Sequence, residues 1–425
     1  MRQRMGFLAI FAVLAMAHVA TAGDRRTITE PKTPDICTSL NATSENDTAA
    51  IQSLNATSKD DTAAIQKALD SCDTGKAVAL SSGIFYSGPL TIPSGVSLLV
   101  DSGATLKAIP NPKLYDKGAD TCGTIDNLGV GCKAFITILK ANGSGIYGKG
   151  TIDGQGGAHI NALNITWWKL SKIASEEGKQ QNSPMLIQIN NSVDITLYQI
   201  VLRNSPLSHV AISEANNLTI WSVIVYAKHA SARQNGFILD GSQYVTIAHS
   251  NITTIGTGIA ISALLAPSQR ISVRDIHFSR GSGLTIGSPA NYGINIVRVS
   301  NITMTILRNG LQISGNNLNG GLIRNISYYN ICMYRVYNPI VMEMVQINET
   351  GSRTPEFKNV TINKMWTGSR GSFVFHGIGK SDAITVAMND VHIARNSAWS
   401  VTNAQVTGNW EYDLTERHCP HNVNN

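Results

Sequence analysis

The sequence predicts an all-β protein built as a single parallel β-helix, with a short capping helix near its N-terminus. The 425 residues are 43% hydrophobic and only 15% charged, which excludes a disordered chain and indicates a large core. Aromatic residues make up 6% and glycines number 37, while Val, Ile, Thr, Ser and Asn are abundant. This composition favours many short strands joined by tight turns over a helical bundle.

A repeat along the middle of the chain predicts how these strands are arranged. Strand phrases such as VDITL and YVTI recur, and their hydrophobic anchors lie 25, 27, 26, 25 and 27 residues apart, at Val193, Leu218, Val245, Ile271, Ile296 and Ile323. A period in the mid-twenties, with alternating hydrophobic residues inside each phrase, is typical of a β-solenoid. The leucine-rich repeat has a similar period, but its L-x-x-L-x-L spacing is missing.

The first 22 residues have the pattern of a secretory signal. Arg2 and Arg4 precede an apolar run over residues 7–20, and Ala20-Thr21-Ala22 has the small-x-small form that signal peptidase cleaves. We therefore expect a secreted, extracellular protein. An uncleaved membrane anchor is the alternative, but the run is short for a bilayer and no later stretch reaches 18 apolar residues.

Residues 23–59 form a predicted N-terminal arm, which contains a duplication. Residues 39–52 and 53–66 are identical at twelve of fourteen positions. Only the second copy continues into a predicted short helix, capped by Asp61-Thr62. The apolar face of this helix would consist of Ala64, Ile65, Ala68 and Leu69. The helix would close the first coil of a β-helix over residues 60–405, and residues 406–425 would form a tail.

The cysteines and the glycosylation sequons fit an oxidising compartment. Six cysteines are present. Two bridges are expected, Cys37–Cys72 and Cys122–Cys132, whereas Cys332 and Cys419 are either paired with each other or singly buried. Twelve N-x-S/T sequons predict a glycoprotein. Several of them lie in a repeated N-hydrophobic-T-hydrophobic phrase, where a structural asparagine is the alternative.

Charge and motifs exclude several other classes of function. The net charge of +6 is small for this length, and no lysine-rich run or aromatic-basic pattern appears, so we expect no nucleic-acid binding. The histidines, His209 among them, stand singly between strands, so we expect no metal site. Because no phosphate-binding glycine loop exists either, we predict no cofactor.

A series of motifs then follows in the order found in one enzyme family. They are GTIDGQGG from Gly150, Trp167-Trp168, NSP from Asn204 with His209 following, and the turns QNGF, TGIAIS and GSGLTIGS. In these motifs, over roughly residues 60–343, the chain resembles the polygalacturonases, glycoside hydrolase family 28. The resemblance implies a right-handed parallel β-helix that hydrolyses the α-1,4 bonds of polygalacturonic acid with inversion.

The letters that carry catalysis in this family are replaced here. The family's N-T-D-G-F is R-Q-N-G-F, so Asn235 stands in place of the first carboxylate. Its Q-D-D-C-I-A-I is I-G-T-G-I-A-I, with Gly256 in place of the general acid and Thr257 in place of a second water-activating carboxylate. Ser282 replaces the histidine of G-H-G-L-S-I-G-S. We therefore assign no catalytic residue.

The substrate-binding letters differ as well. The family's N-G-x-R-I-K is N-G-L-Q-I-S, so Gln312 and Ser314 replace the two cations that grip a galacturonate carboxylate. We keep both as candidate substrate-binding residues, together with Arg233 and Arg280, which flank the degenerate motifs. Residues 215–342 hold nine cations and two acids, an excess of +7 that suits a polyanion such as pectate. Cations spread over all faces of a solenoid would instead only solvate it.

The two acids in that stretch are Asp240 and Asp275, and neither suits a displaced catalytic pair. Asp240 follows Asn235 by five positions, an odd offset that would point it to the opposite face of a continued strand. An inverting glycosidase needs one protonated and one ionised carboxyl group, and Asn, Gly and Thr supply neither.

Three functions are therefore compared. The main hypothesis is a secreted, monomeric polygalacturonase-like protein without hydrolase activity, which binds pectin or polygalacturonate or occupies a polygalacturonase-inhibiting protein. The alternatives are an active polygalacturonase that uses displaced residues, and a structural cell-surface interaction protein.

Overall fold

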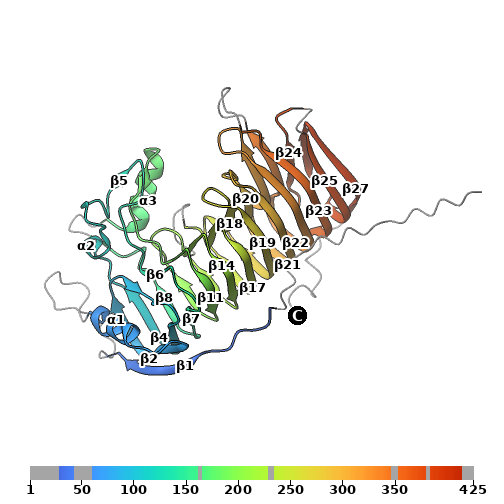
Figure 1. Ribbon diagram of the computed structural model, residues 1–425. Coiled ribbons are helices and arrows are strands. Elements are labelled where there is room, and N and C mark those ends of the chain that lie inside the picture. The colour runs from blue at the N-terminus through green and yellow to red at the C-terminus, as the bar shows by residue number, and fades with distance from the viewer. Residues whose placement is uncertain are drawn as a thin grey trace, which may run out of the picture.

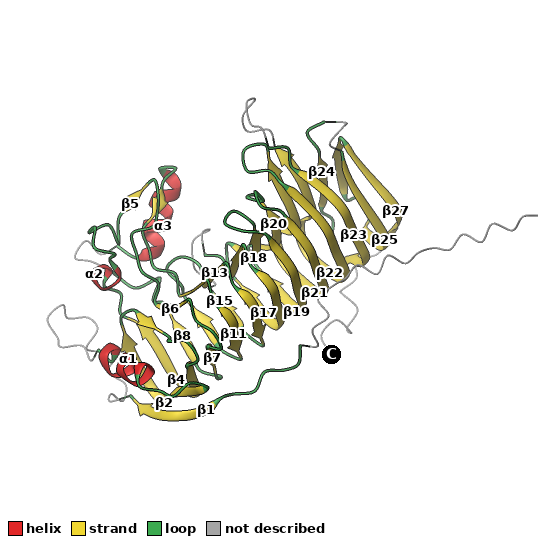
Figure 2. Ribbon diagram, viewed as in Figure 1, coloured by secondary structure: helices red, strands yellow, loops and turns green. Residues whose placement is uncertain are grey.

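The computed structural model describes residues 28–42, 60–160, 165–227, 234–345, 353–379 and 383–413. Within these residues the strands stack in parallel into one long β-helix, which confirms the predicted fold (Figure 1). The helices all lie in the N-terminal half of the described chain (Figure 2). They are α1 (Thr62–Asp70), α2 (Pro112–Tyr115) and α3 (Trp167–Glu176).

Each coil contributes strands to three sheets. The first sheet contains, in order, β3 (Leu90–Thr91), β6 (Ile136–Leu139), β10 (Ile187–Asn190), β13 (Val210–Ser213), β16 (Phe237–Asp240), β18 (Thr257–Ser262), β20 (Ser282–Gly287), the last parts of β21 (Ile294–Asn316) and β22 (Leu322–Val345), β24 (Ser372–His376) and β26 (Ala398–Thr402). The candidate site lies on this sheet.

The other two sheets share several long, bent strands. The second sheet runs through β1 (Asp35–Asn41), β2 (Lys76–Ser87), β4 (Ser97–Ala108), β7 (Gly145–Tyr147), β11 (Val193–Tyr198), β14 (Asn216–Trp221), β17 (Gln243–Thr253), β19 (Ser268–Ser279), β21, β22, β23 (Glu356–Thr367), β25 (Ile384–Ala394) and β27 (Ala404–Asp413). The third sheet contains β8 (Thr151–Asp153), β12 (Val201–Arg203), β15 (Ile224–Tyr226) and the later parts of the long strands. A separate antiparallel pair consists of β5 (Ile125–Asp126) and β9 (Gln180–Gln181).

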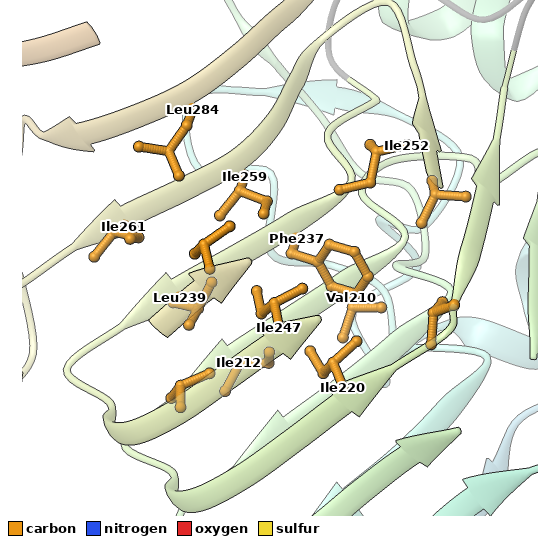
Figure 3. Close-up of a cluster of buried hydrophobic side chains, with 14 of the residues drawn as sticks. Val210, Ile212, Ile220, Phe237, Leu239, Ile247, Ile252, Ile259, Ile261 and Leu284 are labelled. Carbon is orange, nitrogen blue, oxygen red and sulfur yellow. The ribbon is translucent and has the colours of Figure 1, made fainter. Parts of the chain in front are cut away.

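Stacked aliphatic and aromatic side chains fill the interior. Val210, Phe237, Ile259 and Leu284 are register partners on successive strands of the first sheet, and all four are fully buried. Figure 3 shows these side chains gathered in the core. Burying each one stabilises the fold by about 1.5–3 kcal/mol. Because successive residues of a strand point to opposite faces, the residues between them point outward.

Asparagine ladders hold successive coils together where the backbone bends. Asn325 Nδ2 donates to Asn295 Oδ1 at 2.8 Å, and Asn359 Nδ2 donates to Asn325 Oδ1 at 3.1 Å. Asn325 and Asn359 have φ angles of +57° and +54°, in the left-handed region that asparagine tolerates better than most residues. Both are sequon asparagines, so their amide groups already have a structural role.

The helix α1 covers the N-terminal end of the core through Ile65 and Leu69, which are fully buried. The predicted cap is wrong in detail. The Thr62 N–H donates to the Asp60 side chain at 2.9 Å, while the Asp61 carboxylate accepts the Tyr86 N–H at 3.0 Å. Asp61 therefore ties the helix to β2 instead of capping it, and the residue before it satisfies the helix terminus.

The β-helix extends beyond both predicted boundaries. In the predicted arm, β1 pairs in parallel with β2, and at the other end β27 pairs with β25 as far as Asp413. The segment before β1 runs beneath β7 and β11 in Figure 1, where the Tyr198 hydroxyl donates to Glu30 at 2.6 Å. The predicted signal peptide, residues 43–59 of the duplication and the tail after residue 413 lie outside the described residues.

The expected disulfides Cys37–Cys72 and Cys122–Cys132 are both present. Cys332 is disulfide-bonded as well, and its expected partner Cys419 lies outside the described residues. None of the helices in the described parts of the chain is long and apolar enough to cross a membrane.

Candidate functional site

The candidate face is the outward side of β13, β16, β18, β20 and the first-sheet parts of β21 and β22. On its edge, at or just before the start of each strand, successive coils place one small uncharged residue in register. We call this set the polar row, and it consists of Ser208, Asn235, Thr257, Ser282, Asn309 and Asn338. The face therefore brings together Asn235, Thr257 and Ser282, three of the positions at which the sequence predicts a replaced catalytic residue.

Asn235 is held in the polar row by its neighbours on both sides. Its Oδ1 accepts the backbone N–H of Thr257 at 2.8 Å, and its Nδ2 donates to Ser208 Oγ at 3.5 Å. Both of its side-chain functions are thus used within the protein. No described carboxylate lies within hydrogen-bond distance of Asn235, Thr257 or Ser282.

Gly256 directly precedes Thr257 of the polar row, and the neighbouring atoms leave no room for a side chain there. A Cβ atom built at Gly256 would lie 2.6 Å from Asn235 Oδ1 and 2.7 Å from the backbone oxygen of Gln234. The Gly256 N–H also donates to that same oxygen at 3.2 Å. Real Cβ atoms do not approach other atoms this closely, so any side chain here requires the backbone to move.

His209 supports Asn235 from below. Its Nδ1 and its backbone N–H both donate to the Asn235 carbonyl oxygen at 2.9 Å, which fixes the hydrogen on Nδ1 because a carbonyl can only accept. The ring is fully buried, and desolvation lowers the pKa of His209 to about 4. His209 is therefore neutral and structural, as expected of a single histidine between strands, although its Nε2 has no partner among the described residues.

The predicted substrate-binding residues Gln312 and Ser314 lie on the candidate face and bond to each other. Asn309 Nδ2 donates to Gln312 Oε1 at 3.0 Å, and Gln312 Nε2 donates to Ser314 Oγ at 2.8 Å. One strand thus presents positions 309, 312 and 314 on the same face. By the same register, Asn235, Ile238 and Asp240 share a face in β16.

The sequence-based prediction that Asp240 points to the opposite face is therefore wrong. The odd offset from Asn235 does not send it to the opposite face, because the chain bends at Gly236 before β16 begins and breaks the alternation. Asp240 is nevertheless committed to structure, since its Oδ1 accepts the Leu264 N–H at 2.7 Å. Asp275 lies on another corner, paired with Arg274 at 3.0 Å.

The two predicted arginines differ in outcome. Arg280 is exposed at the turn before Ser282, and its guanidinium makes no ion pair or hydrogen bond with any described residue. Arg233 lies outside the described residues. Other cations are spread around the solenoid, where Arg270 stacks on Tyr244 and Arg335 on Tyr334. Much of the predicted positive excess thus lies away from the candidate face.

Asp153 is a carboxylic acid that the sequence argument passed over. It ends β8, near the corner between the third and first sheets, and accepts hydrogen bonds from Asn204 Nδ2 at 3.1 Å and from the Gln155 N–H at 2.9 Å. Burial raises the pKa of Asp153 despite these two bonds. The GTIDGQGG motif contains this residue, but nothing in its letters indicated that the carboxyl would be half-buried.

Two other features lie away from the candidate face. A cavity of about 1090 Å³ borders the second sheet, beside Arg298, Arg324 and Lys358. In the described chain, the ligand atoms of one histidine on β25 and two carboxylates on β27, those of His392, Glu411 and Asp413, lie within 4.8 Å of one another. Both carboxylates are at least partly exposed, and His392 serves them as an ion-pair partner, with its Nδ1 2.8 Å from Glu411.

The profile of the glycosyl hydrolases family 28 matches residues 87–410. The chain belongs to this family. An endo-polygalacturonase of Pectobacterium parmentieri is 37% identical over 407 residues, which are 95% of this chain and 96% of that protein. A polygalacturonase of Ralstonia solanacearum is 30% identical over 91% of this chain and 82% of its own length.

Two solved polygalacturonase structures share the fold. The polygalacturonase from Erwinia carotovora ssp. carotovora superposes with a TM-score of 0.83 at 37% identity, over 91% of this chain and 100% of that one. The exopolygalacturonase from Thermotoga maritima, at 18% identity, superposes with a TM-score of 0.71 over 91% and 94% of the two chains, which is a likeness of fold.

Proposed function

We propose that this family 28 protein binds a pectin-type galacturonan along its candidate face without hydrolysing it. Family membership supports the choice of polymer. The neutral polar row supports the absence of hydrolysis, because inversion requires two carboxyl groups about 6.5–9.5 Å apart with the scissile bond between them. The exposed Arg280 at the edge of the face supports binding of an acidic polymer.

The packing around Gly256 carries this proposal. A catalytic acid at this position needs a side chain, and its first atom would already overlap Asn235 Oδ1 and the Gln234 carbonyl. The position has therefore adapted to glycine and does not hold an empty space for a carboxylate. Loss of an acid or base typically slows a reaction by about 10²- to 10⁴-fold, and here the acid and both basic carboxylates are replaced.

An active polygalacturonase is the second candidate, favoured by 37% identity with an endo-polygalacturonase over almost the whole chain. It would need another pair of acids. The acids on the candidate face, Asp240 and Glu343, stand on β16 and β22, four strands apart, or about 19 Å at the usual strand spacing. That distance is too long for either glycosidase geometry. Asp153, with its raised pKa, is the better single candidate for an acid.

Release of reducing ends from polygalacturonate by the purified chain separates the two candidates. We expect no release above a heat-inactivated sample, while co-sedimentation with insoluble pectin shows binding. Release that Asp153→Asn abolishes would establish the second candidate and overturn the proposal.

A matched pair of arginine variants tests pectin binding separately from hydrolysis. Arg280→Ala should weaken retention on polygalacturonate, whereas Arg270→Ala, which removes a cation stacked on Tyr244 of the second sheet, should not. A protein that binds no pectin, but is captured by a polygalacturonase-inhibiting protein, would contradict pectin binding and support the decoy alternative.

A further inference from the structure

The floor of the candidate face carries no positive charge in the described chain. Its outward residues are small, polar or aliphatic, apart from two acids. Beyond the polar row they are Ala211, Ser213, Ile238, Asp240, Ala260, Ser262, Thr285, Gln312, Ser314, Val341 and Glu343. The Glu343 carboxylate lies 3.5 Å from Nδ1 of His376, whereas the Asp240 carboxylate contacts only backbone N–H groups.

Three exposed arginines of the described chain stand at one edge of this floor. Arg280, Arg308 and Arg370 are all exposed, and each lies within two residues before a first-sheet strand position, where the chain passes from the third sheet to the first. A negatively charged sugar can meet a cation at this edge. Among the described residues, it meets none over the floor.

A free galacturonate carboxylate on the floor would lose hydration without gaining an ion pair, which is costly. The available donors are amides and hydroxyls, and Gln312 and Ser314 already bond to each other. Asp240 and Glu343 would also repel a third carboxylate nearby.

A methyl-esterified galacturonate avoids each of these costs. Its ester is uncharged, and its carbonyl still accepts a hydrogen bond from an amide or hydroxyl of the polar row. Its methyl group can pack on the two half-buried aliphatic residues in the middle of the floor, Ile238 and Ala260, which are register partners on β16 and β18.

We infer that the candidate face selects methyl-esterified galacturonan over the free acid. This inference rests on the proposed function, because it assumes that the face binds pectin. It assigns the floor, which offers no described cation, to the esterified sugars, and the arginine edge to the minority of free carboxylates in the same polymer.

One polymer measured before and after saponification tests the inference at constant chain length. Binding of the full chain to highly methyl-esterified pectin is compared with binding to the same sample after alkaline removal of the esters, by titration calorimetry at 150 mM salt. We expect at least about fivefold tighter binding to the esterified form. Equal or tighter binding to the saponified form overturns the inference and leaves pectin binding intact. Binding to neither form overturns the proposed function itself.

A charge added to the floor should reverse the preference. Gln312→Lys places a cation beside Ser314, so binding to the saponified polymer should strengthen about tenfold relative to the esterified one. Thr385→Lys adds the same charge at an exposed position of β25, on the second sheet, and should leave the ratio unchanged. An unchanged ratio in Gln312→Lys, or an equal change in both variants, contradicts the assignment of the floor.

Discussion

His209 and Gly256 show how single residues outside the polar row position a residue on the candidate face. Neither faces a ligand, yet both determine where Asn235 lies. His209 bonds to its backbone carbonyl, and Gly256 leaves room for its side-chain oxygen. The position of Asn235 on the face thus depends on two residues that do not themselves belong to the polar row.

The buried His209 makes stability depend on pH. Because the pKa of His209 is lowered to about 4, the unfolded state binds more protons than the native state between pH 4 and 6.5. Stability from this group is complete above pH 6.5 and is lost as the pH falls through that window, by up to about 1.4 kcal/mol per pH unit.

His209→Gln keeps an amide donor for the Asn235 carbonyl but does not titrate. Urea unfolding at a series of pH values between 4 and 7 should therefore show a shallower slope for the variant than for the wild type. Identical slopes would mean that His209 does not carry this pH dependence.

Restoring an acid at Gly256 should destabilise the protein instead of reviving hydrolysis. The new Cβ must displace Asn235 or the Gln234 backbone, and such overpacking costs about 1–3 kcal/mol. Thr257→Asp is the matched control, since its side chain is already half-exposed on the face, and we expect a change below about 1 kcal/mol. Thermal unfolding of the two variants gives the comparison. A Gly256→Asp protein as stable as the control would show that the position is open.

At the scale of elements, asparagine ladders connect one coil to the next. In the ladder of Asn295, Asn325 and Asn359 the middle residue makes two amide bonds and the last residue makes one. Glycine tolerates the same left-handed backbone, so Asn→Gly substitutions report mainly on the hydrogen bonds.

Asn325→Gly should cost about 1–3 kcal/mol and Asn359→Gly about half as much, measured by denaturant unfolding. The ladder predicts a larger loss at its centre than at its end. Equal losses would indicate that the amides do not act as a connected unit.

For the molecule as a whole, the first coil depends on its covalent link. Cys37 ties β1 to the end of α1 across 35 residues, and closing a loop of that length constrains the unfolded chain by about 3–4 kcal/mol. In a solenoid each coil contacts only its neighbours, so the effect should remain local.

Hydrogen exchange of a Cys37→Ser/Cys72→Ser variant tests this locality. Faster exchange is expected in β1 and α1, while β16, β18 and β20 keep their protection. Loss of protection throughout would mean that the β-helix unfolds as one cooperative unit and not from its end.

The repeat period and the family motifs were sufficient to predict the fold, because stacking in register leaves a regular hydrophobic period in the sequence. Finer features were less accessible. The cap at Asp60 depends on which of two adjacent aspartates reaches the first helical N–H group, and the outward direction of Asp240 depends on a backbone bend at Gly236 that breaks the alternation. The tight packing around Gly256 and the half-buried state of Asp153 arise from contacts between coils, and the sequence of one strand does not show which residues of the next coil will contact it.

The regular stacking of coils also has a consequence for the size of what the face retains. Successive members of the polar row are held one strand apart by backbone hydrogen bonding, so its six positions span about 24 Å that side-chain changes cannot lengthen or shorten. Binding to such a surface depends on the length of the polysaccharide. A long polysaccharide contacts every position of the polar row at once, whereas the shorter fragments left by cleavage of the polymer contact fewer positions. Under the proposed function, progressive digestion of the pectin by other enzymes would therefore release the protein without any change in the protein itself.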